Sequence, residues 1–274
     1  MTGCRSNVDR VQNYLSKGEY NRAIQRVDNL KRDEEINEAD DLIKNEIENL
    51  KNKYISGEID GTLAISEIEK LRSSNRTDIN NALEAAKENI HMRMNSKKAF
   101  DDGIKFEDEG NYKDALESYH LVSEYDEDNY KNAADRIEAL IIKLSKEQIL
   151  TVEETHVIVT SATHKSLYPD QLQIIFRNNG NANITKFRVT IFGYDTDGNP
   201  VKIDNGTDKS YMFIGLGEGV TIRPGQLWGH EYGWSVDNDN IKRIEAYVES
   251  AEYEDGTVWE NPLYTEFIRN HKIE

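Results

Sequence analysis

Hydrophobic residues recur every three or four positions through the first half of the chain. This spacing predicts helices over seven segments: residues 6–16, 20–32, 36–54, 60–72, 77–109, 113–125 and 129–147. In the second segment, Ala23, Val27 and Leu30 fall on one face of a helix. Glycines and polar stretches separate the segments and indicate where the helices end. The first half is therefore expected to form helical hairpins.

After residue 148 the hydrophobic residues alternate with polar ones, as they do in strands. Phe187, Val189 and Ile191 alternate with polar residues, which predicts a strand with one face in water. Tight turns are predicted at residues 178–181 and 195–200, because Asn and Gly adopt positive φ angles at little cost. Similar short strands are predicted over residues 171–177, 212–216 and 241–248. The second half is therefore expected to be an antiparallel β-sandwich.

The fold class predicted from these patterns is α plus β in two domains. Residues 1–5 would be a tether, residues 6–148 an all-α domain of helical hairpins, and residues 149–274 a β-sandwich domain. A chain of 274 residues is long enough for two domains of ~100–200 residues each. The four prolines and three tryptophans all follow residue 150, which supports a division near that point.

A seven-residue segment occurs twice in the helical half, as GEYNRAI at residues 18–24 and GNYKDAL at residues 110–116. Repeated helix–turn–helix units form stacked helical hairpins. The second copy resembles a tetratricopeptide repeat, although the usual proline is absent and Glu127 and Asp128 lie in that region. The matching packing positions are Gly103, Phe106, Gly110, Tyr112, Ala115 and Tyr119. The resemblance implies a domain that binds a protein or a peptide.

Short motifs in the second half resemble the FxLYD-like, immunoglobulin-type modules of Firmicutes surface lipoproteins. The resemblance covers about residues 152–265. The matching residues are Asn178, Gly180, Phe192, Tyr194, Asp195 and Gly198, with a later turn at Arg223, Pro224, Gly225 and Gln226. It implies an immunoglobulin-like sandwich at the surface of a Gram-positive cell, and it implies no enzymatic activity.

The charge and the single cysteine limit where the protein could act. The chain has 51 acidic and 34 basic residues, a net charge of −17, which repels nucleic acid and anionic lipid. No apolar run of ~18 residues is present to span a membrane. Cys4 excludes an internal disulfide because it has no second cysteine to pair with. We expect no nucleic-acid partner.

Residues 1–4 resemble the end of a bacterial lipobox, in which the cysteine receives a lipid. This resemblance implies an extracytoplasmic protein, with its signal peptide removed, held at the membrane only through a lipid on Cys4. The alternative is a chance cysteine near the end of a cytoplasmic protein.

Candidate chemistry is sparse. None of the six histidines lies at a zinc-binding spacing from another, no G-x-S-x-G motif occurs, and no cofactor or metal is expected. Asp195 and Asp197 alternate as calcium ligands do, but Asp204 stands where the loop requires a glutamate, so a turn is favoured. We expect no enzymatic activity, and a site formed at the domain junction is the alternative.

Four aromatic residues are the candidate ligand-binding residues: Trp228, Tyr232, Trp234 and Trp259. Aromatic faces bind sugar rings and proline-rich peptides, whereas packing in the core is the competing interpretation for Trp228 and Trp234. The function predicted is a non-enzymatic, cell-surface binding or scaffolding protein for an envelope protein or peptide. The alternatives are a module that binds cell-wall glycan (peptidoglycan) and a cytosolic scaffold for protein interactions.

Overall fold

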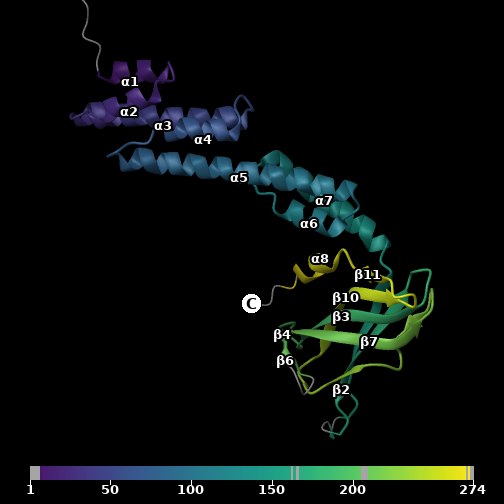
Figure 1. The fold of residues 1–274 in the computed structure, drawn as a ribbon. Coiled ribbons are helices and arrows are strands. Elements are labelled where there is room, and N and C mark those ends of the chain that lie inside the picture. The colour runs from purple at the N-terminus through teal and green to yellow at the C-terminus, as the bar shows by residue number, and fades with distance from the viewer. Residues whose placement is uncertain (1–6, 162, 165–166, 205–208, 270, 272–274) are drawn as a thin grey trace, which may run out of the picture. The chain divides into compact units, whose positions relative to one another are not determined.

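The computed structural model describes residues 7–161, 163–164, 167–204, 209–269 and 271. The chain divides into two compact units, residues 1–137 and residues 138–274, and the division falls within one helix, α7 (Glu127–Lys146). We call them the helical unit and the β unit. Each has a hydrophobic core of its own, and Figure 1 shows their elements.

All seven predicted helices are present in the described part of the chain, which confirms the all-helical first half. Besides α7 they are α1 (Asn7–Leu15), α2 (Tyr20–Asp28), α3 (Asp33–Ile55), α4 (Gly61–Glu69), α5 (Thr77–Asp108) and α6 (Tyr112–His120). Three of them, α2, α4 and α6, end three to five residues earlier than predicted. After α2, Leu30 is still buried because the following turn folds it back onto the core, so its hydrophobic pattern extended the prediction to residue 32.

The β unit contains two main antiparallel sheets, which confirms the predicted class of the second half. One sheet has β1 (Leu150–Ile158), β2 (Asp170–Asn178), β8 (Leu227–Trp228) and β9 (Trp234–Val236). The other has β11 (Val258–Glu260), β10 (Arg243–Tyr253), β3 (Ile184–Tyr194), β4 (Pro200–Val201) and β7 (Met212–Ile222). β5 (Ile203–Asp204) and β6 (Lys209–Ser210) pair antiparallel as a small separate sheet.

The inner faces of the two sheets share one core. Phe176 of β2 and Phe187 of β3 lie at its centre, with ring centroids 4.6 Å apart. Val189 and Ile191 follow Phe187 on the same face and are fully buried, as the alternation predicted. Aromatic pairs at this separation add to the stability that burial itself provides.

The other face of β3 is not fully in water, contrary to the prediction. A short helix that was not predicted, α8 (Tyr264–Arg269), covers part of it. The Tyr264 and Thr190 hydroxyls are hydrogen-bonded at 2.8 Å, so Thr190 is buried. His271 stacks on Phe192 with 4.7 Å between ring centroids. Six residues are too few for a helical period to be visible in the sequence, so only packing reveals this helix.

Candidate ligand-binding cleft

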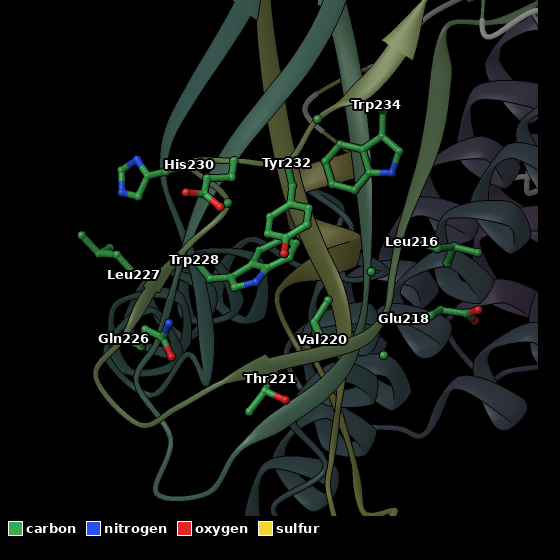
Figure 2. A pocket seen from close by; sticks show the side chains of 15 residues that line it. Leu216, Glu218, Val220, Thr221, Gln226, Leu227, Trp228, His230, Tyr232 and Trp234 are labelled. Carbon is green, nitrogen blue, oxygen red and sulfur yellow. The ribbon is translucent and has the colours of Figure 1, made fainter.

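A cleft of about 740 Å³ opens at one edge of the β unit. One wall is the second half of β7, residues 216–221, and the other is the segment that carries β8 and β9, residues 226–234. Figure 2 shows the side chains that line it. We call this space the aromatic cleft, because three of the four candidate aromatic residues lie in it.

Trp228 and Tyr232 form a stacked pair in the aromatic cleft (Figure 2). Their ring centroids are 4.7 Å apart and their planes differ by 11°. Tyr232 is 57 % exposed, so its ring presents an open face to solvent. Trp228 is half-buried and also meets the edge of Phe187, with 5.5 Å between centroids. The pair is therefore anchored in the core at one end and open to a ligand at the other.

Trp234 is the third aromatic side chain of the cleft, and a glycine makes room for it. A Cβ atom at Gly215 would lie only 2.9 Å from the indole ring, well inside carbon–carbon contact distance. Trp234 also meets Phe187 edge-on, with 6.5 Å between ring centroids. Gly217, two residues along β7, similarly leaves room for the Phe187 ring. Glycine at alternate positions of β7 thus lets two large rings, Trp234 and Phe187, pack beneath the strand.

The loop between β8 and β9 is held by close backbone contact with β2. Gly229 has a φ of +120°, and a Cβ there would overlap the Ile174 carbonyl oxygen. The Gln173 side-chain amide donates a 2.7 Å hydrogen bond to the His230 carbonyl, and the Tyr232 amide donates to the Gly229 carbonyl at 3.1 Å. These bonds fix the loop, so Tyr232 is positioned before any ligand arrives.

The charged groups of the aromatic cleft are carboxylates. Glu218 and Glu231 line it, together with His230, and none of the described residues that line it is a lysine or an arginine. Glu218 forms an ion pair with Lys186, with 2.8 Å between Oε1 and Nζ. The hydrogen bond to Glu218 is the main reason that the pKa of Lys186 is raised. The negative charge of Glu231 is left in the cleft, and it favours a neutral or positively charged ligand.

Trp259 lies away from the other three aromatic residues. It belongs to β11, which borders one edge of its sheet, whereas β7 borders the other. Trp259 is half-buried and packs against the core opposite Ala251. Trp259 was predicted to belong with the cleft residues because a sequence does not show the order of strands in a sheet. Glu218 and Glu231 were not predicted as cleft residues, although the alternate glycines of β7 were a visible signal.

The repeat-packing residues of the helical unit lie between α5 and α6. A Cβ at Gly103 would lie 2.5 Å from the Tyr119 ring, so the glycine lets the two helices approach. Tyr119 is buried, and its hydroxyl donates a 2.7 Å hydrogen bond to Glu107. Burial first, and then this bond, raise the pKa of Tyr119. Ala115 is fully buried. Phe106 and Tyr112 are half-buried, and Gly110 adopts a φ of +77° in the turn.

The remaining candidates are Cys4 and the acidic turn. Cys4 lies outside the described residues, so its lipid attachment stays a prediction. Asp195 accepts 2.9 Å hydrogen bonds from the amides of Asp197 and Asn199, and the latter lowers the pKa of Asp195 most. Its oxygens therefore stabilise a β-turn. Nowhere in the described ranges do three or more His, Cys, Asp or Glu side chains gather as a metal ion would require.

Comparisons with known proteins give a family match over part of the chain and no activity. No curated protein matches the chain. An X-ray structure at 1.85 Å of a hypothetical protein from Peptoclostridium difficile 630 covers 45 % of this chain and 91 % of its own, with 14 % identity and a TM-score of 0.36. Among the described residues, no helix is both long enough and apolar enough to cross a membrane. Residues 171–274, which include the whole aromatic cleft, match the family of unknown function DUF5780.

Proposed function

We propose that this is a non-enzymatic binding protein of the cell surface, whose β unit holds an extended, positively charged peptide segment of an envelope protein. The observation that carries the proposal is the stacked Trp228–Tyr232 pair, open to solvent, in a cleft whose charged side chains are carboxylates. The tetratricopeptide-like and FxLYD-like resemblances support a role in protein interaction outside the cytoplasm.

The backbone of β7 supports an extended peptide as the ligand. Six consecutive residues of this strand, 216–221, form one wall of the aromatic cleft. Gly217 and Gly219 have no side chains to cover the main chain at this wall. An extended peptide can therefore exchange main-chain hydrogen bonds with one wall while its side chains contact the aromatic rings of the other.

The charge of the cleft supports a basic peptide. A lysine or arginine over the open face of Tyr232 would gain a cation–π interaction, which is worth about 0.5–1 kcal/mol at an exposed site. Glu231 is exposed and could pair with a second cation. An acidic peptide would instead meet two carboxylates and the net charge of −17.

A glycan is the second candidate ligand, because the Tyr232 ring is also a flat platform. Sugar rings stack on exposed aromatic faces of this kind. A glycan would use the ring and the polar side chains of the cleft, but it would have no need for the strand edge. This difference in the groups used separates the two candidates.

The test is selection of a displayed library of short random peptides on the full-length protein, followed by calorimetry with the enriched peptides. We expect enrichment of Lys and Arg, and we expect Tyr232→Ala to weaken binding about tenfold or more. Tyr168→Ala is the matched control, because Tyr168 is 56 % exposed and lies outside the cleft.

The outcome also decides between peptide and glycan. Absence of enriched peptides, or equal binding by the Tyr232→Ala and Tyr168→Ala proteins, would refute the peptide proposal. Binding of soluble muropeptides that is lost in Tyr232→Ala but kept in Tyr168→Ala would favour the glycan.

A further inference from the structure

The outer edge of β7 has no strand beside it in the described part of the chain. β7 pairs with β3 along one side, in continuous register from Met212 opposite Phe192 to Glu218 opposite Lys186. No strand of the described residues pairs with its other side, and the Met212 amide donates to the Ser210 hydroxyl at 3.1 Å. Such an edge is a template for pairing with another strand.

The first half of β7 carries none of the features that usually prevent such pairing. Residues 211–217, YMFIGLG, contain no charge and no proline in a chain in which 31 % of residues are charged. Met212 is 43 % exposed and Leu216 is 47 % exposed, both on the outer face of the sheet. Edge strands are normally protected by lysine, proline or a bulge. This segment is regular, apolar and open.

We propose that β7 pairs with β7 of a second copy of this chain, antiparallel, about a two-fold axis at Ile214. Directly opposite residues in an antiparallel pair point to the same face. An axis at Ile214 places Met212 opposite Leu216 of the second copy, and Leu216 opposite its Met212. The two exposed apolar side chains of each copy are thereby covered by those of the other.

The outer face of β7 also sets the register. With the axis at Ile214, each of the exposed residues Met212 and Leu216 lies opposite an apolar residue. Shifting the axis to Gly215 would place Met212 opposite Glu218. Shifting it to Phe213 would place Leu216 opposite Ser210. Of these three axes, only the one at Ile214 places both Met212 and Leu216 opposite apolar residues, so the segment favours one register.

Charge sets the salt dependence of this association. Two copies that each carry a net charge of −17 repel one another at long range. The paired segment itself is uncharged, so screening by salt removes the repulsion without weakening the contact. The dimer should therefore become tighter as the salt concentration rises. A basic partner on an acidic surface would show the opposite trend.

Cysteine cross-linking in the full-length chain tests the register directly. In a Cys4→Ser background, Ile214→Cys places two thiols opposite each other across the axis. Opposite Cα atoms in an antiparallel pair are about 4.5–5.5 Å apart, within the range that a disulfide spans. Met212→Cys is the matched control, because its two copies would be ~14 Å apart, four residues along the strand. The Met212→Cys, Leu216→Cys double variant should cross-link again.

Analytical ultracentrifugation tests whether the unmodified protein associates. We expect a concentration-dependent dimer. Leu216→Lys should raise its dissociation constant about tenfold or more, because the lysine of each copy lies opposite the apolar Met212 side chain of the other. Val258→Lys is the control, because Val258 is 53 % exposed on β11, the opposite edge of the sheet. A monomer at all protein and salt concentrations, or equal cross-linking of the Ile214→Cys and Met212→Cys proteins, would overturn the inference.

Discussion

Gly217→Ala is expected to destabilise the β unit by crowding the ring beneath the aromatic cleft. A Cβ at position 217 would overlap two atoms of the Phe187 ring and lie 2.7 Å from a third, Cδ1. Carbon atoms in contact are normally about 3.5–4.0 Å apart. Phe187 is only 1 % exposed, with Phe176 and Trp228 against it, so its ring has little room to move.

Two opposing contributions set the size of the effect. Crowding a well-packed core costs about 1–3 kcal/mol. Alanine in a strand is favoured over glycine by about 0.5–1 kcal/mol, because it loses less backbone entropy on folding. We expect the free energy of unfolding to fall by about 1 kcal/mol. For a unit of this size, that corresponds to a Tm about 4 °C lower.

Tryptophan fluorescence is the appropriate assay, because all three tryptophans lie in the β unit and report only its unfolding. Phe187→Leu is the control, because it removes the ring that the Cβ of Ala at position 217 would overlap. In the double variant, the cost of Gly217→Ala should be smaller than in the otherwise unchanged protein. A Gly217→Ala protein with an unchanged or raised Tm, or strictly additive effects in the double variant, would refute this account of β7.

Two further predictions concern a buried side chain and an ion-pair network. Asn178→Ala should lower the free energy of unfolding of the β unit by about 3 kcal/mol, because Asn178 is fully buried and its side-chain amide donates to two main-chain carbonyls. Urea titrations followed by fluorescence measure this free energy. Asn179→Ala, at an exposed position, should lower it much less, and equal losses in the two variants would contradict the prediction. Hydrogen bonds from Arg72 and then Lys87 lower the pKa of Glu69 from 4.5 to about 2, so its stabilising effect is present above pH 4.5 and is lost as the pH falls towards 2. Because Glu69 is 42 % exposed, Glu69→Gln should lower the free energy of unfolding at pH 7 by less than ~1 kcal/mol, measured by circular dichroism of the helices. A stability difference between Glu69→Gln and the unchanged protein that persists at pH 2 would show that the ion pairs of Glu69 are not its cause.

The class of each half of the molecule was predictable because helices and strands are local. The spacing of Ala23, Val27 and Leu30, or of Phe187, Val189 and Ile191, is a property of neighbouring residues and needs no knowledge of distant ones. The seven helices were located from this spacing alone. Their ends were less predictable, because a buried residue such as Leu30 can contribute to the core from a turn as well as from a helix.

The candidate site was predictable only in part, for the same reason. Trp228, Tyr232 and Trp234 were placed together because seven residues contain all three. That Trp259 lies elsewhere depends on the order of strands, which sets β11 and β7 at opposite edges of one sheet. Strand order results from contacts between segments far apart in the chain, and no local pattern encodes them.

The sequence by itself determined a helical first half, an antiparallel β second half, and an aromatic cluster near residue 230. Tertiary structure alone decided which faces and edges stay open. It covered part of β3 with α8, and it aligned Gly215 and Gly217 with Trp234 and Phe187. Within the described part of the chain, it gave β7 only β3 as a paired strand. These features depend on contacts between segments that are distant in the sequence, and those contacts are determined only when the whole unit packs.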